Sequence, residues 1–205
     1  MDIAITLLIV AVAWQAARMR YQRGRIALLG SHLANLQLER HMETLTQGYL
    51  RAIHEPDESR QLQVLDTYAP TERTVAAQAK TLADTMQKES PQATGMSTFP
   101  FCLPYVERFL FNTRDFRALL QIHAAGLRHV VDNEAGWDPK TRAFHLSAEL
   151  YLLQHSCHWY CKSRNTADAR LLMRHRVSRK EVLESVSDVT REAYRRWMRG
   201  VCARK

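Results

Sequence analysis

The sequence lacks most of the patterns that assign a chain to a known class of protein. It shows no convincing alternation of apolar and polar residues with a period of two, so we predict an all-α fold without β-strands. No internal repeat period is evident. No catalytic motif occurs above its chance expectation, and the sequence therefore does not indicate an enzyme.

Composition sets the next limits. Of the 205 residues, 46% are hydrophobic and 24% are charged, which is a globular balance and excludes a disordered chain. The mean hydropathy of −0.35 excludes several membrane spans, because each span would need about 20 mostly apolar residues. At most one span fits in the chain.

The one long apolar run covers residues 3–17, reads IAITLLIVAVAWQAA and carries no charge. Trp14 stands near its end, where an aromatic ring would lie at a membrane interface. At about 1.5 Å a residue the run spans roughly 22 Å of a hydrocarbon core about 30 Å thick, so we expect Arg18 and Arg20 to reach back to the headgroups. We predict an uncleaved membrane anchor with a basic flank over residues 1–25. The alternatives are a cleaved secretory signal and a buried helix of a soluble protein.

Charge at the two ends of this run predicts its orientation. Only Asp2 precedes the run, whereas four arginines follow it: Arg18, Arg20, Arg23 and Arg25. Because basic flanks stay on the cytoplasmic side, we predict an N-terminus outside and the bulk of the chain in the cytoplasm. The chain has 6 lysines and 23 arginines, a ratio common in GC-rich bacterial genomes, so we favour a bacterial-type inner membrane over a mitochondrial outer membrane.

A helical stalk is predicted over residues 26–89. Its helical pattern continues without a breaker until Pro56, and an apolar stripe recurs at three- and four-residue steps: Ile26, Leu29, Leu33 and Leu36. The stripe covers about two heptads, so it either packs on the chain's own domain or joins two copies in a coiled coil.

A connector is predicted over residues 90–104, which read SPQATGMSTFPFCLP and contain three prolines and one glycine. Its apolar side chains are too numerous for a free linker, so we expect them to pack on the domain: Met96, Phe99, Phe101 and Leu103.

A compact helical bundle with a basic C-terminal helix is predicted over residues 105–205. The helix over about residues 140–162 is apolar nearly all round, which places it in the middle of the bundle. A capping box at residues 178–181 opens the last helix, whose predicted apolar face includes Val189 and Trp197.

The densest chemical cluster of the sequence lies on that central helix. Cys157 and Cys161 are four residues apart and share a helical face with His158, so the three side chains form a candidate metal site. Further ligands would have to come from elsewhere by folding: Cys102, His123, His129 or His175. Ordinary core packing of reduced thiols is the alternative for these cysteines and for Cys202, and we expect no bound cofactor.

His145 and Glu149 form a second pair on the same predicted helix, four residues apart. Such a pair acts as general acid and base if it lines a cleft, and a core hydrogen bond is the alternative. No further carboxylate or nucleophile is placed by the sequence to join the pair.

The excess positive charge lies entirely in the C-terminal part. From Lys162 onward there are 13 basic and 5 acidic residues, which accounts for the net charge of +8. Arg191, Arg195 and Arg199 recur at four-residue steps and point away from the predicted apolar face of the last helix. We predict that these arginines form a basic contact surface for an acidic protein or anionic lipid, with nucleic acid as the less favoured partner.

Together these patterns favour a single-pass, membrane-anchored helical protein that serves as an interaction or scaffold module, as an accessory subunit of a membrane assembly. Its expected partners are membrane lipid, through the N-terminal helix, and a protein at the membrane. Two alternatives stay open: an anchored enzyme or metal and redox protein that uses the His/Cys cluster, and a membrane-tethered nucleic-acid-binding protein.

Overall fold

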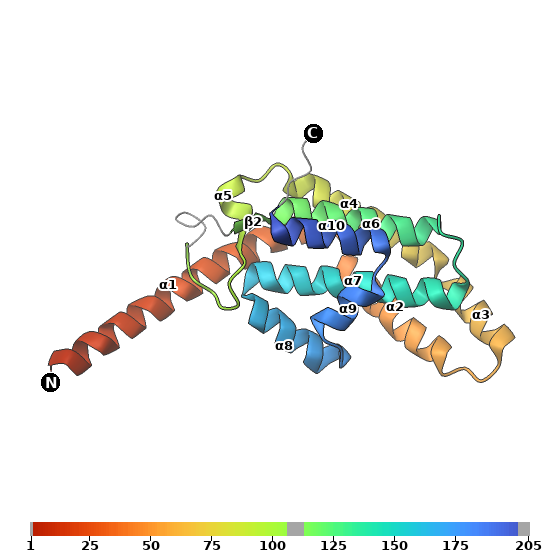
Figure 1. Cartoon of the computed structure of the whole chain (residues 1–205), viewed down its shortest axis with the longest axis horizontal. Coiled ribbons are helices and arrows are strands. Elements are labelled where there is room, and N and C mark those ends of the chain that lie inside the picture. Colours follow the sequence, from red (N-terminus) through yellow and green to blue (C-terminus); the bar gives the residue numbers. More distant parts are fainter. Residues whose placement is uncertain (1, 106–112, 201–205) are drawn as a thin grey trace.

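The computed structural model describes residues 2–105 and 113–200, and in those ranges the chain is almost entirely helical (Figure 1). In chain order the helices are α1 (Asp2–Leu33), α2 (Leu38–Ile53), α3 (Glu58–Thr67), α4 (Ala69–Met86), α5 (Pro91–Thr94), α6 (Phe116–Asp132), α7 (Pro139–Cys161), α8 (Arg164–His175), α9 (Arg179–Ser185) and α10 (Asp188–Arg199). The prediction of an all-α fold is confirmed.

One pair of short strands departs from that prediction. β1 (Gly95–Ser97) and β2 (Thr113–Asp115) pair antiparallel, with Met96 opposite Arg114. Strands of three residues are too short to show a period of two in the sequence, which is why they were not predicted.

Helix α1 extends as an arm from the rest of the molecule, and its N-terminal half projects beyond the other helices (Figure 1). It is long and apolar enough to cross a membrane, and none of its most apolar window is buried in the protein. Its C-terminal end packs on the bundle, where Leu29 is buried.

The helical pattern does not run on to Pro56 as expected, because α1 ends at Leu33 and α2 begins at Leu38. The turn between them is closed by a hydrogen bond from Leu36 N to Leu33 O of 2.9 Å. Both leucines pack against the core at this turn, so burial of their side chains explains why the helix is interrupted there. The apolar stripe that begins at Ile26 therefore meets the chain's own core.

Helix α7 lies in the middle of the bundle and contacts helices α1, α2, α3, α6, α8 and α9. Its N-terminus is capped by Asp138, which accepts hydrogen bonds from the amides of Lys140 and Thr141. The buried residues of α7 cover most of its circumference, as the sequence predicted, and include Leu146, Leu150, Leu152, Leu153, Trp159 and Tyr160.

The last predicted helix is in fact two helices. The capping box at Ser178 and Glu181 is present, but α9 ends at Ser185 and α10 begins at Asp188. The chain breaks there because Ser187 both caps α10 and donates a hydrogen bond to the buried carboxylate of Glu149. Trp197 is buried as predicted, but Val189 is 50% exposed, and Thr190 and Tyr194 complete the buried face of α10.

Candidate functional site: a groove along helix α7

A groove follows a face of α7 that is bordered by helices α1, α2, α3, α8 and α9. Its part nearer to α1 lies between α1, α2, α7 and α8 and has a volume of about 630 Å³. Its second part lies between α2, α3, α7 and α9 and has a volume of about 450 Å³. The two parts adjoin each other at four lining residues that they share, and we treat them together as the groove: Thr46, Leu50, Tyr151 and His175.

The floor of the groove is a single helical face. The α7 residues that line the groove include a series at steps of three and four, with neighbours such as Ala148, Leu150, Leu153 and His158 beside it: Lys140, Phe144, Ser147, Tyr151, Gln154, Cys157 and Cys161. At 1.5 Å a residue this face is roughly 30 Å long. The groove is therefore elongated and offers contacts at helical spacing.

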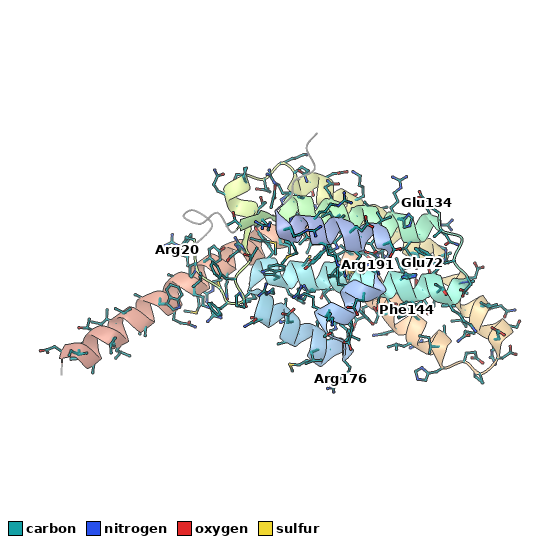
Figure 2. The ribbon with its side chains drawn as sticks, viewed as in Figure 1. Arg20, Glu72, Glu134, Phe144, Arg176 and Arg191 are labelled. Atoms are coloured by element: carbon teal, nitrogen blue, oxygen red, sulfur yellow. The ribbon has the colours of Figure 1, made fainter. Side chains whose placement is uncertain are left out.

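Large apolar side chains lie open to solvent along the groove. Leu50 is 52% exposed, Phe144 is 58% exposed and Ile53 is 68% exposed. Figure 2 marks Phe144 and Arg176 on the side of the bundle occupied by α8 and α9. A cluster of exposed apolar residues around a concave surface is typical of a binding site.

The two walls of the groove carry opposite charge near α1. Helix α2 contributes Glu39 and Glu43, whereas α8 contributes Arg170 and Arg174. Arg174 Nη2 lies 3.7 Å from Glu43 Oε1, so one ion pair bridges the two walls. Because both side chains are about half exposed, such a pair stabilises the fold by no more than about 1 kcal/mol.

The predicted metal ligands Cys157, His158 and Cys161 line this groove and are half-buried. The guanidinium of Arg170 donates to Nδ1 of His158 at 3.0 Å, which occupies that ring nitrogen. Burial raises the pKa of the Cys157 thiol and raises the pKa of Cys161 to about 11, while burial and Arg170 lower the pKa of His158 to about 4. At neutral pH the three groups are therefore two thiols and a neutral imidazole.

The other suggested ligands lie apart from this cluster. Cys102 is buried near Arg25, His123 pairs with Ser156, and His129 faces Glu134. His175 alone reaches the groove, where its ring stacks on Tyr151 at 3.9 Å. Within residues 2–105 and 113–200, no group of three or more His, Cys, Asp or Glu side chains is arranged to hold a metal ion. Cys202 lies outside the described residues.

His145 and Glu149 do not form an acid–base pair. The imidazole of His145 donates through Nδ1 to the carbonyl of Ser185 at 2.8 Å and packs on Trp137. Glu149 is fully buried and accepts hydrogen bonds from the amide and hydroxyl of Ser187. Burial raises the pKa of Glu149 to about 7. Each residue serves the packing of α7 against α9 and α10, which is the alternative that the sequence left open.

Sequence reasoning missed a set of buried polar pairs behind the groove. His123 Nε2 lies 2.8 Å from Ser156 Oγ, and His155 Nε2 lies 2.7 Å from Asp168 Oδ1. Burial lowers the pKa of His123 to about 3, so this ring stays neutral. Partners 33 and 13 residues apart show no spacing that a sequence could reveal. Both histidine rings are buried and line neither part of the groove.

One arginine of the predicted basic flank takes part in the junction between α1 and the bundle, together with the buried Leu29 and the hydrogen bond from Lys162 to Gln22. Arg25 is buried and donates hydrogen bonds to the carbonyl oxygens of Tyr160, at 3.0 Å, and Gly95. Its guanidinium carbon also lies 4.4 Å from the ring centroid of Tyr21 and 4.7 Å from that of Tyr160. Arg25 thereby ties α1 to α7 and to β1.

The other three arginines of that flank have no such role. Arg20 and Arg23 are exposed and Arg18 is half-exposed. Figure 2 shows Arg20 on the arm of α1, outside the bundle. The four arginines that the sequence grouped together thus divide into one structural residue and three that face solvent.

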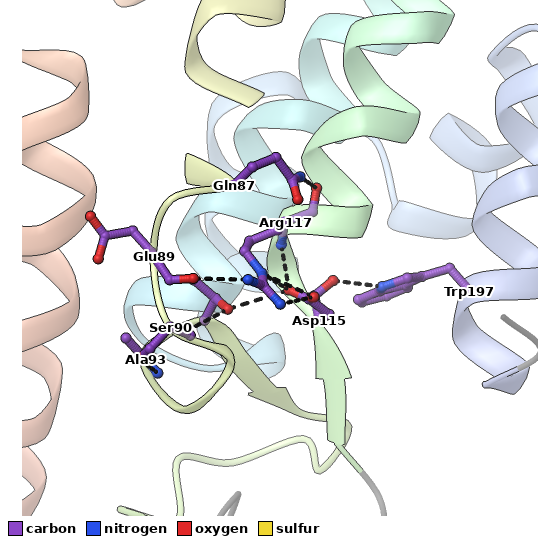
Figure 3. Close-up of polar contacts among 8 residues, drawn as sticks. Gln87, Glu89, Ser90, Ala93, Asp115, Arg117 and Trp197 are labelled. Atoms are coloured by element: carbon purple, nitrogen blue, oxygen red, sulfur yellow. Dashed lines mark hydrogen bonds and ion pairs between the residues drawn. The ribbon is translucent and has the colours of Figure 1, made fainter. Parts of the chain in front are cut away.

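The C-terminal end of α10 lies near this junction. Trp197 Nε1 donates to Asp115 O at 2.9 Å, and Asp115 also caps α6 and binds the guanidinium of Arg117 (Figure 3). Arg114, the neighbouring residue of β2, donates to Met198 O at 3.0 Å. Because β2 pairs with β1, whose Gly95 binds Arg25, these contacts place the end of α10 on the α1 side of the bundle.

The predicted basic stripe on α10 is only partly free. Arg195 and Arg199 are exposed. Arg191 instead pairs with Asp188 and donates to Glu184 O at 3.2 Å, which ties it to the α9–α10 break. The exposed part of the stripe is therefore at the end of α10 that lies towards α1.

Comparison with protein-family models, with curated proteins and with solved structures finds no match to this chain.

Proposed function

We propose that this chain is a single-pass, membrane-anchored interaction module, an accessory subunit of a membrane assembly, and that it receives a protein partner in the groove along α7. The observation that carries the proposal is the groove itself, an elongated apolar surface with Leu50, Ile53 and Phe144 exposed along it. A contiguous exposed apolar surface of this kind is often a site of interaction.

Anchoring by the N-terminal half of α1 supports this role. The exposed apolar residues of α1 are followed by the exposed arginines Arg20 and Arg23, the order expected for a cytoplasmic bundle. Ile26, the first groove residue on α1, lies nine residues beyond Ala17, or about 13 Å along the helix. The groove would begin just outside the headgroup layer.

Positive charge at the same end of the bundle supports contact with an anionic surface. The exposed Arg195 and Arg199 lie at the end of α10 that is linked to the α1 junction. Anionic headgroups attract each exposed arginine by about 1 kcal/mol near the surface. We assign these residues to contact with anionic lipid or with an acidic partner at the membrane.

The alternatives receive less support from the geometry. An enzyme would need His145 and Glu149 to converge on an open cleft, but the two side chains bind different backbone segments and Glu149 is fully buried. A nucleic-acid-binding protein would need a continuous basic face, whereas Arg191 is already paired with Asp188.

Purification of the full-length chain in mild detergent tests the proposal. We expect a membrane protein to co-purify in near-stoichiometric amount, to be lost with Leu50→Glu and to be retained with Leu172→Glu. The second variant is a matched control, because Leu172 is 55% exposed but does not line the groove. Absence of any co-purifying protein, or equal retention by both variants, would contradict the proposal.

Orientation is tested separately by reporter fusions after Lys205. A reporter that is active only in the cytoplasm should work, and one that requires the periplasm should not. The opposite result would overturn the proposed localisation without bearing on the groove.

A further inference from the structure

We infer that the occupant of the groove is an amphipathic α-helix of the partner, with an apolar stripe between one acidic edge and one basic edge. This inference rests on the proposed function and specifies its partner. It follows from three properties of the groove: the spacing of its floor, the charge of its two walls and the ion pair that joins them.

The floor favours a helix over other ligands. Side chains of α7 line it at steps of three and four residues over roughly 30 Å, a spacing that the side chains of a second helix match. Its two walls are formed by helices α2 and α8–α9, so an occupant lies lengthwise between helices. An acyl chain is about one CH₂ group wide and would leave most of this floor uncovered.

The walls specify the edges of that helix. Glu39 and Glu43 lie one turn apart on α2, and Arg170 and Arg174 lie one turn apart on α8. A partner helix that rests between them meets carboxylates on one side and guanidinium groups on the other. Its basic residues would face α2 and its acidic residues would face α8. An anionic lipid would be repelled by the α2 wall.

The ion pair between the walls indicates how the groove opens. Glu43 and Arg174 bridge α2 and α8 at 3.7 Å across the site. A partner helix with one acidic and one basic edge offers each of these residues a new counter-ion, so neither charge is left unpaired when the bridge opens. A helix with two acidic edges or two basic edges would leave one of the two without a partner.

Photo-crosslinking of the full-length chain in its native membrane tests the shape of the occupant. Benzoylphenylalanine would replace Leu50 and, separately, Phe144, with Leu172 as the matched exposed control outside the groove. We expect both groove positions to crosslink to one helical segment of a partner, with apolar residues at steps of three and four. Crosslinks to lipid, to an extended segment, or at Leu172 alone would overturn the inference.

A charge exchange tests the edges. The double substitution Glu43→Arg with Arg174→Glu keeps an ion pair between the walls but gives each wall one charge of either sign. We expect binding of the crosslinked partner to weaken at least tenfold, with an unchanged thermal midpoint. The control, Glu43→Gln with Arg174→Gln, should weaken binding less than the exchange does. Equal binding by wild type and the exchanged variant would show that the charges of the two walls do not contribute to recognition of the partner helix.

The two proposals fail in different ways. If a protein co-purifies with the wild-type chain but crosslinks only outside the groove, the interaction module stands and the helix in the groove is wrong. If no protein co-purifies and no groove position crosslinks, both are wrong.

Discussion

The two halves of helix α1 differ in which of their residues the protein buries. The apolar half, residues 3–17, is exposed almost throughout, whereas the more polar half contains Arg25 and Gln22, both buried. Hydrophobicity alone therefore does not decide what the protein core covers. Exposure of the apolar half is what the proposed membrane anchor would require, and Arg25 is buried because carbonyl oxygens and aromatic rings satisfy its guanidinium group.

The largest effect is expected from a substitution that places charge in the apolar half of α1. Leu8→Arg with Ile9→Arg should move nearly all of the chain from the membrane fraction to the soluble fraction, because each arginine at the centre of a span costs about 2.5 to 3.5 kcal/mol. The thermal midpoint of the bundle should not change, since both side chains are exposed. Retention in the membrane, or unfolding of the bundle, would show that this half has a different role.

Removal of the buried charge is the reciprocal change. Arg25→Met should lower the free energy of unfolding by about 2 to 4 kcal/mol, because the carbonyls of Tyr160 and Gly95 lose their donors. Chemical unfolding of the full-length chain in detergent measures this cost, and membrane retention should be unaffected. Arg23→Met is the matched control on an exposed arginine and should cost less than about 0.5 kcal/mol. Similar costs for both variants would contradict the assigned role of Arg25.

Glu149 provides a second buried ionisable group with weaker partners. Its pKa is raised from 4.5 to about 7. Between these two pH values the carboxyl group is protonated in the folded state and ionised in the unfolded state. This contribution to stability is complete below pH 4.5 and is lost as the pH rises to about 7, at about 1.4 kcal/mol for each pH unit.

The Glu149→Gln variant isolates that contribution. His123 acts in the opposite sense, because its pKa is lowered to about 3 and its stabilisation is lost as the pH falls below 6.5. The measurement is therefore the difference in unfolding free energy between wild type and variant from pH 4.5 to 7. We expect wild type to lose stability relative to the variant across this range, and a constant difference would contradict the buried, protonated state of Glu149.

The smallest expected effect concerns Cys157, a half-buried side chain on the groove. Cys157→Ala should lower the thermal midpoint by no more than a few degrees, equivalent to less than about 1 kcal/mol, because only a small contact is lost. Chelators should leave the midpoint of the wild-type chain unchanged. Stoichiometric zinc that leaves with Cys157→Ala would restore the metal-site hypothesis and weaken that of an interaction groove.

The sequence predicted the helices better than it predicted where they end. Periodicity and the caps at Asp138 and Ser178 located α7 and α9, because these features act over a few residues. The turn after Leu33 and the break at Ser187 depend on contacts with the core and with Glu149, which no local pattern contains. Because the chain breaks at Ser187, Thr190 and Tyr194 are buried on α10 and Val189 is exposed.

The candidate site shows the same division. Helical spacing predicted that Cys157, His158 and Cys161 share one face of a helix, and in the structure all three line the groove. The sequence did not indicate that Arg170 would bind His158, nor that Arg25 would leave the basic flank to bind the carbonyl of Tyr160, 135 residues away. Both contacts arise only when α1 and α8 pack on α7.

Arg25 also decides how the proposed anchor would let the bundle move. If α1 is a membrane anchor, its contacts with α7 would restrict the tilt of the bundle, whereas a flexible tether would let the bundle sample many tilts. The groove would then stay at one height above the membrane, in a layer that begins about 13 Å beyond the apolar run of α1. A helix tethered within that layer meets the groove at high effective concentration, and a helix held outside it does not meet the groove, whatever its affinity.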